Sequence, residues 1–267
     1  MAITTLAGVQ SGLQAPVHFN KFLSSGGATG KPWSTFFYNG FPAAAAAPTP
    51  GLSGAALTSY ANQLPFTNPP SGNTYLGRLQ VSANVSGTVL LCDRLWHNSG
   101  ITITSTTAQT ISSVEWPARD SNGATSGEGV LIGVEVSGAT GAGTPTLSMT
   151  YTNNAGTSGR IGTNVVATAA TTAVGGFYPI GLAAGDVGVQ SIQNFTLSAT
   201  WTSGTIHLVA YRVIAALEIP TAASSASIDA LTAGFPQMFD NTVPFFIVIP
   251  AQGTTPQLSG QLLYTQG

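Results

Sequence analysis

The stretch NFTLSATW, residues 194–201, alternates apolar and polar side chains along its whole length. One set of alternate positions holds Phe195, Leu197, Ala199 and Trp201, and the other holds Thr196, Ser198 and Thr200. Because successive side chains of a β-strand point to opposite faces, this pattern predicts a strand with one buried face. The stretch TLSMTY, residues 146–151, repeats it, with Leu147, Met149 and Tyr151 expected to point inward.

Two longer stretches are apolar on both faces: GVLIGVEV (129–136) and IHLVAYRVIAALEI (206–219). Such runs are typical of central strands that are covered on both sides. Between the strands lie clusters rich in Gly and Asn, such as TNNAGTSG, and these residues supply the positive φ angles of tight turns. Amphipathic patterns of helical length are almost absent. The sequence therefore predicts an all-β protein, an antiparallel β-sandwich or jelly roll.

The N-terminal part of the chain, residues 1–75, lacks this alternation. Five alanines at 43–47 could begin a helix, but Pro42 and Pro48 bracket them and leave too few residues to nucleate one. We therefore expect an extended, irregular N-terminal arm over residues 1–75.

The rest of the chain is expected to form a β-sandwich domain over residues 76–220, followed by a linker and C-terminal closing strands over residues 221–267. Small residues after Pro220 predict a linker or a short helix around Ser227–Ala233. The stretch VPFFIVIP (243–250) is bounded by prolines, which favours an edge strand. An exposed apolar edge invites pairing with other chains, so a partner or the N-terminal arm must cover it.

Large aromatic side chains are dense in the arm, and water is a poor environment for them. Two surfaces could cover these side chains: the chain's own domain or a neighbouring chain. The residues expected to contact a partner are Phe19, Phe22, Trp33, Phe36, Phe37, Tyr38 and Phe41 of the arm, with Phe245 and Phe246 of the C-terminal part.

Charge is scarce in this sequence. Only 6% of the residues are Asp, Glu, Lys or Arg, against roughly 25% in an average soluble domain. A surface this neutral favours burial against other subunits, so we expect a homo-oligomer or a larger assembly. The seven Lys and Arg residues form no basic cluster, so nucleic acid is not an expected partner.

Membrane and export signals are also absent from the sequence. Thr, Ser, Gly or Pro interrupts every apolar run before the roughly 18 residues that a membrane helix needs. The first residues show no basic region followed by an apolar one, so we expect no Sec-type export.

The stretch LLCDRLWHNSG, residues 90–100, holds the only cysteine of the chain, Cys92, together with His97. On a regular strand their separation of five positions places the two side chains on opposite faces, so they are not expected to form a nucleophile and base pair. The leucines around Cys92 predict a buried, unreactive thiol. Asp93 and Arg94 are expected to form ion pairs at a strand edge or across strands.

Other candidate sites fail on spacing. His18, His97 and His207 are far apart and form no zinc-binding motif. The stretch SGGATGKPW (25–33) lacks the first glycine and the hydroxyl residue of a phosphate-binding loop. We therefore expect no metal and no cofactor.

Four acids fall within 21 residues and offer the carboxylates that a glycosidase needs, namely Glu115, Asp120, Glu128 and Glu135. Asp120 and Glu128 lie in a Gly-rich turn, however, where carboxylates are usually solvated. We therefore expect no catalytic residue and no enzyme.

Three segments resemble virion structural proteins of tailed bacteriophages: LLCDRLWHNSGI (90–101), the long stretch from TISSVEWPARD to NNAGTSGR (110–160), and QLLYTQG (261–267). The resemblance spans roughly residues 77–267. It covers head decoration (cement) proteins, neck or tail components and fibre modules, and it brings no catalytic residue with it. It implies non-covalent assembly with other virion proteins, after synthesis in the host cytoplasm.

The function expected from these observations is that of a capsid decoration protein, which binds and stabilises the phage head through its arm and apolar surfaces. The major capsid protein and copies of the chain itself are its expected partners. The alternative is a tail, neck or fibre component that binds a receptor or carbohydrate, for which Trp116 beside Asp120 and Asn122 is the one hint. A coat or tail-tube subunit is a third possibility, and a depolymerase comes last.

Overall fold

The computed structural model describes residues 3, 5–22, 30–253 and 255–267, so part of the stretch 25–33 lies outside the described residues. Within them it has one helix, α1 (Leu6–Ser11), whose first turn is capped by the hydroxyl of Thr5. The strands of the first half are β1 (Val17–Phe22), β2 (Trp33–Ser34), β3 (Asn39–Phe41), β4 (Ala55–Ala56), β5 (Thr74–Ala83), β6 (Gly87–His97), β7 (Gln109–Thr110) and β8 (Val130–Gly138). Those of the second half are β9 (Leu147–Asn153), β10 (Arg160–Asn164), β11 (Phe177–Gly181), β12 (Val189–Leu197), β13 (Thr205–Ile219), β14 (Ser224–Asp229), β15 (Gln237–Met238), β16 (Pro244–Pro250) and β17 (Gln257–Gln266).

The strands form two sheets, and every pair among the described residues is antiparallel. The smaller sheet has the order β14-β5-β17-β1-β3, with β15 also on β5. The larger sheet has the order β2-β16-β6-β13-β8-β11-β10-β9-β12-β7, with β4 on β6. The predicted all-β fold of the sandwich or jelly-roll kind is confirmed.

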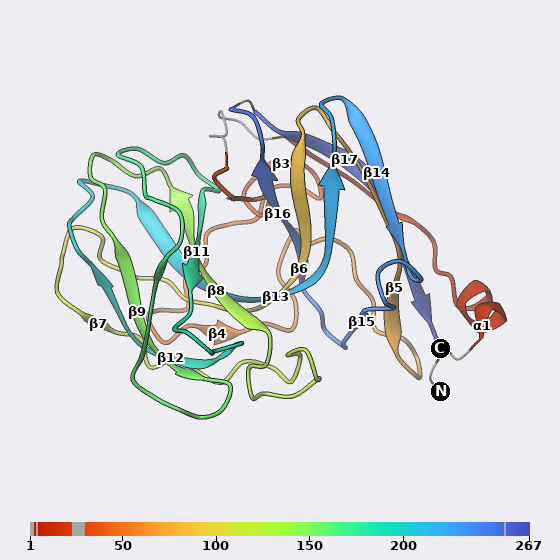
Figure 1. Cartoon of the computed structure of the whole chain (residues 1–267), viewed down its shortest axis with the longest axis horizontal. Helices are drawn as coiled ribbons and strands as arrows, with labels where there is room; N and C mark the ends of the chain where they lie inside the picture. Colours follow the sequence, from red (N-terminus) through yellow and green to blue (C-terminus); the bar gives the residue numbers. More distant parts are fainter. Residues whose placement is uncertain (1–2, 4, 23–29, 254) are drawn as a thin grey trace.

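One face of the larger sheet contributes to two hydrophobic cores. At one end, β6, β13 and β16 face the smaller sheet, which is the right-hand part of Figure 1. At the other end the sheet curls so that β8, β9 and β12 enclose a second core, on the left of Figure 1. The 15-residue strand β13 belongs to both: Leu208 lies in the curled core and Leu217 in the core between the sheets.

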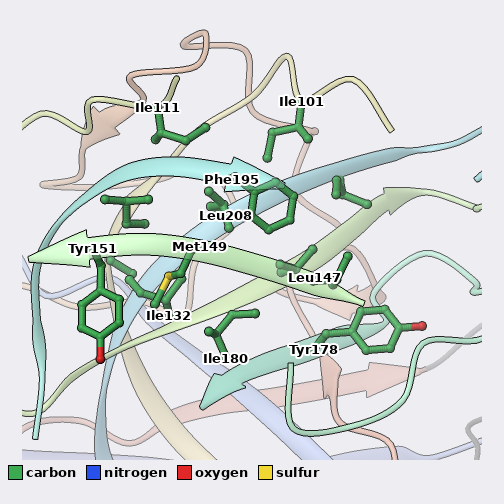
Figure 2. Close-up of a cluster of buried hydrophobic side chains, with 14 of the residues drawn as sticks. Ile101, Ile111, Ile132, Leu147, Met149, Tyr151, Tyr178, Ile180, Phe195 and Leu208 are labelled. Carbon is green, nitrogen blue, oxygen red and sulfur yellow. The ribbon is translucent and has the colours of Figure 1, made fainter. Parts of the chain in front are cut away.

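Figure 2 shows the curled core, in which side chains from several strands point into one interior. Leu147, Met149 and Tyr151 are buried there, as the alternation predicted, and so are Phe195 and Leu197. The prediction is wrong for Ala199, which is exposed, because β12 ends at Leu197 and the chain then turns. Trp201 returns to the core beyond that turn.

The opposite face of the larger sheet is covered by the N-terminal arm. Phe36, Ala45 and Leu57 of the arm pack on Cys92 and Tyr211 of the sheet, in a third cluster that we call the covered face. It also contains Phe177, Val209, Val243, Phe245 and Ile247. The alanines at 43–47 form no helix, as predicted.

A buried lysine holds the arm in place. The ammonium group of Lys21 on β1 donates to the carbonyl oxygens of Tyr38 (3.2 Å), Pro42 (2.7 Å) and Ala43 (3.3 Å). Burial lowers the pKa of Lys21 to about 8. Lys21 lies in the arm itself, so this contact fastens residues 38–43 to β1, the part of the arm that belongs to the smaller sheet.

The division into ranges 1–75, 76–220 and 221–267 stays a prediction, but strands from all three share one sheet. In that sheet β17 lies between β1 and β5. The expected linker or helix around Ser227–Ala233 is instead the end of β14 followed by a turn. β16 is not an edge strand, because β2 of the arm pairs with it at Ile247 and Val248.

Candidate functional site

The stretch 90–100 forms most of β6, between β13 and β16, and the first three residues of the irregular connection that follows. On β13, Ala210 pairs with Trp96 of β6, and the next residue, Tyr211, pairs with Arg94. Leu95 lies between the two partners on β6 and is the extra residue of a β-bulge. The bulge turns His97 to the covered face, where its ring packs against Tyr60 with the centroids 4.9 Å apart. Cys92 and His97 therefore lie on the same face, and the prediction from strict alternation is wrong.

Cys92 is fully buried within the covered face. Burial, and next the neighbouring charge of Asp93, raise the pKa of its thiol well above the ordinary value. His97 is engaged elsewhere, because its Nδ1 accepts a hydrogen bond from Nε of Arg94 at 3.2 Å. These two side chains form no nucleophile and base pair.

Two ion pairs are buried beneath the arm. Arg94 on β6 reaches past β13 to Glu135 on β8, with Nη2 and Oε2 2.7 Å apart and both side chains fully buried. No hydrogen bond joins the two groups, so charge attraction holds the pair. Within the described residues Nη1 of Arg94 and Oε1 of Glu135 have no hydrogen-bond partner. The Arg94 guanidinium also lies over the Phe36 ring, 4.8 Å from its centroid.

The second pair joins Asp93 to Arg119, which lies in the connection between β7 and β8. Nε and Nη2 of Arg119 donate to the two carboxylate oxygens of Asp93 at 2.8 and 3.1 Å, a bidentate contact. Arg119 also donates to the carbonyl oxygen of Leu57 in the arm, and the Val243 amide donates to Asp93. Asp93 and Arg94 are thus paired across the fold and not at a strand edge, and nothing local in the sequence marks Arg119 or Glu135 as their partners.

Two histidines separated by 110 positions, His97 and His207, lie in this region. His207 on β13 lies opposite Glu135, and its Nδ1 is 2.9 Å from the carbonyl oxygen of Asn98. Burial lowers the pKa of His207 to about 4, against the opposing effect of Glu135. Burial, then the charge of Arg94, lowers the pKa of His97 to about 2. Both rings are therefore neutral at pH 7.

The loop after Arg119 is organised by the buried carboxylate of Asp120. It accepts hydrogen bonds from the amides of Asn122, Ala124, Gly127 and Glu128 and from the Ser126 hydroxyl. Burial acts to raise the pKa of Asp120, but the hydrogen bonds outweigh it and the net pKa is lowered. The expectation that turn carboxylates here are solvated is wrong for Asp120.

The other three acids of the proposed glycosidase group lie in different settings. Glu115 is exposed, Glu128 accepts from Asn154 at 2.5 Å, and Glu135 is paired with Arg94. Trp116 is only 1% exposed and packs on Trp96, so it offers no ring to a sugar beside Asp120 and Asn122.

Most residues expected to contact a partner are covered by the chain itself. Six of the nine are buried, namely Phe19, Trp33, Phe36, Tyr38, Phe245 and Phe246. Their burial on the chain's own strands corrects the expectation of partner contact for them, because no surface is left to offer. Phe22 is 44% and Phe41 is 56% exposed, and Phe37 is half-buried. For these three, partner contact stays a prediction.

All 16 charged residues lie in the part of the chain that the structure describes, and their placement leaves the surface nearly neutral. Seven are buried, namely Lys21, Asp93, Arg94, Arg119, Asp120, Glu135 and Arg212. Five are exposed, namely Arg78, Glu115, Glu218, Asp229 and Asp240. The remaining four are half-buried.

Apolar side chains are exposed at several places, most of all Leu6 (73%) and Leu231 (76%). Both line one hollow of about 230 Å³ beside α1, with Ile3, Val9 and Phe235. On the other half of the molecule Ile161, Val165 and Val187 are exposed.

The described residues form neither a cluster of metal ligands nor a membrane-spanning helix. No three His, Cys, Asp or Glu side chains among them are grouped so as to hold a metal ion. The one helix within the described ranges is too short to cross a membrane.

Comparisons with known proteins give little similarity. No protein-family model and no curated protein matches the chain. Among solved structures, the VP2 subviral particle of infectious bursal disease virus is 9% identical, with 96% of this chain and 82% of that chain covered and a TM-score of 0.21. A structure of the Gx strain of the same virus is 12% identical, with 95% and 82% covered and a TM-score of 0.19. Both of these structures come from one virus, and both resemble this chain only weakly.

Proposed function

We propose that this chain is a non-enzymatic virion structural protein, and specifically a capsid decoration protein of a tailed phage head. The observation that carries the proposal is the distribution of charge. With seven of its 16 charged side chains buried and only five exposed, the chain has little to keep it dispersed as an isolated monomer. A surface of this kind suits a protein that is permanently assembled with other subunits.

The surfaces that we expect a partner to cover are the exposed apolar ones. The hollow lined by Leu6 and Leu231 is the strongest, since two leucines that are about three-quarters exposed flank it. The arm contributes through Phe22, Phe37 and Phe41, while its buried aromatics stabilise the chain's own fold. The partners are the major capsid protein and neighbouring copies of the chain, and assembly occurs in the host cytoplasm.

The test uses heads from a phage genome that lacks the gene for this chain, incubated with the purified protein. We expect saturable binding to heads, measured by co-sedimentation and located by electron microscopy. Leu6→Ser with Leu231→Ser should weaken binding at least tenfold. Val165→Ser with Val187→Ser removes two other exposed apolar side chains and serves as the control.

Two results would overturn the proposal. One is a chain that stays monomeric in light scattering and binds neither heads nor itself. The other is binding to tails alone, which would favour the alternative role.

That alternative, a fibre, neck or tail component that binds carbohydrate, has one observation in its favour. A hollow of about 460 Å³ crosses the outer face of the smaller sheet and is lined by uncharged polar side chains beside the exposed ring of Phe22. These are Asn20, Ser82, Asn84, Ser224, Ser225, Gln257 and Ser259. Amide and hydroxyl groups around an aromatic ring are suited to sugar hydroxyls and to the apolar face of a pyranose.

Binding of host-cell polysaccharide to the chain and to Phe22→Ala distinguishes the two roles. Binding that Phe22→Ala abolishes would favour the fibre component, and absence of binding would leave the decoration protein as the better proposal. Phe41→Ala, which removes the second exposed ring of this sheet, is the matched control.

A further inference from the structure

Ser137 occupies the extra position of a second β-bulge. On β13 the neighbours Thr205 and Ile206 pair with Gly138 and Val136 of β8, so Ser137 has no partner in the ladder. Bulges re-aim side chains, and here the side chain of Ser137 comes to lie on the face that carries His207.

The Ser137 hydroxyl and the His207 ring are hydrogen-bonded. Oγ of Ser137 is 2.5 Å from Nε2 of His207 and 2.9 Å from the hydroxyl of Thr205. On the other side of the ring, Nδ1 is 2.9 Å from the carbonyl oxygen of Asn98. Because a carbonyl only accepts, Nδ1 carries the proton, and Nε2 is left to accept the proton of Ser137.

The residue that orients His207 is itself fixed. Asn98 is fully buried, its Oδ1 accepts from the amide of Leu208 at 2.7 Å, and its Nδ2 donates to the carbonyl oxygen of Leu52 at 3.1 Å. The arrangement thus has a hydroxyl, a base and a group that holds the base in one tautomer, which is what activates a serine.

The pair opens onto a cavity. A hollow of about 340 Å³ is lined by Ser137, Thr205 and His207 together with Pro48, Ile101 and Ile206. The apolar residues of this lining suit a short acyl chain. Ser137 is half-buried and therefore reachable from this space.

We propose that Ser137 is a nucleophile, activated by His207, that accepts an acyl group from an activated carboxylic ester. In the step, Oγ of Ser137 forms a bond to the acyl carbon while its proton passes to Nε2 of His207. The bond from the acyl carbon to the leaving oxygen then breaks, and His207 returns the proton to the departing alcohol. The product is an ester of Ser137, with no oxidant or metal required.

Burial lowers the pKa of His207 to about 4, so the ring is neutral and able to accept a proton at pH 7. A base with so low a pKa accepts that proton weakly. Good leaving groups are therefore required, which limits the donors to activated esters such as p-nitrophenyl esters. The inference does not rest on the proposed role in the virion.

The experiment treats the whole purified chain with a fluorophosphonate probe, which reacts with activated serines, and maps the adduct by peptide mass spectrometry. We expect one probe per chain, on Ser137, with no adduct in Ser137→Ala. Ser259→Ala, which removes an exposed hydroxyl from the smaller sheet, should label as the unmodified chain does. Circular dichroism of each variant verifies the fold.

His207→Gln should slow the labelling at least tenfold, and p-nitrophenyl acetate should release about one equivalent of nitrophenol in a burst. No adduct on Ser137, or adducts spread evenly over surface serines, would overturn the inference whether or not the His207 variant folds. If the chain hydrolyses the ester continuously and Ser137→Ala abolishes this hydrolysis, the result would support Ser137 as the nucleophile. It would contradict only the statement, under the proposed function, that the chain is not an enzyme.

Discussion

Arg94 and Glu135 are separated by a whole strand of the sheet, yet their side chains meet in a fully buried ion pair. Removing one partner of such a pair leaves an uncompensated charge in the interior, which typically costs about 3 to 5 kcal/mol of stability. We therefore predict that Glu135→Leu lowers the free energy of unfolding by an amount in that range, as measured by urea denaturation. Arg94→Met with Glu135→Leu should recover most of the loss, and a double variant no better than Glu135→Leu would contradict this account.

The buried histidines make the fold sensitive to acid. The pKa of His207 falls from 6.5 to about 4 on folding, so the unfolded chain binds more protons between those values. The stability contributed by neutral His207 is therefore complete above pH 6.5 and is lost as the pH falls toward 4, to an extent of the order of 3 kcal/mol. We predict that the free energy of unfolding of His207→Gln, measured by urea denaturation between pH 7 and pH 4, changes less with pH than that of the unmodified chain. An equal slope in the unmodified chain and in His207→Gln would exclude His207 as the cause.

The loop of residues 120–128 is expected to depend on the charge of Asp120. Because the pKa of this carboxyl is lowered on folding, its contribution is present above its unfolded pKa and is lost as the pH falls through the folded value. Asp120→Ala removes the acceptor of five hydrogen bonds and should lower the free energy of unfolding by at least about 2 kcal/mol. Limited proteolysis should then cleave within the loop. Glu115→Ala, which changes an exposed acid nearby, should do neither.

Removal of residues 1–75 tests whether the arm belongs to the fold or serves attachment alone. The deletion removes β1 from the edge of β17 and uncovers Cys92, Tyr211 and Phe245. Each large side chain of the arm that is buried contributes about 1.5 to 3 kcal/mol, so we expect residues 76–267 to be unfolded or aggregated. Circular dichroism and nuclear magnetic resonance check this. A folded fragment with normal dispersion of its amide resonances would show that the arm is dispensable for folding.

The strands and much of the burial could be predicted from the sequence, because alternation is a local property. Leu147, Met149 and Phe195 lie inside as the period of two requires. The same rule failed where the backbone breaks the period: the bulge at Leu95 reverses the face of His97.

The candidate sites could not be predicted in the same way. Ion pairs such as Asp93 with Arg119, and the contact of Ser137 with His207, join residues 26 and 70 positions apart. The order of strands in the sheet brings Ser137 to His207, and the course of the connection between β7 and β8 brings Arg119 to Asp93. The aromatics of the arm were found from composition, but composition does not say whether the chain itself or a neighbour covers them.

The participation of β13 in both hydrophobic cores has a mechanical consequence. The strand is hydrogen-bonded to β6 on one side and β8 on the other. A pulling force along the axis of β13 therefore loads both ladders in shear. In that geometry many hydrogen bonds bear the force at once and must break together, and they do not open one after another. Either half of the molecule then transmits tension to the other without hinging, which is the behaviour of a rigid strut.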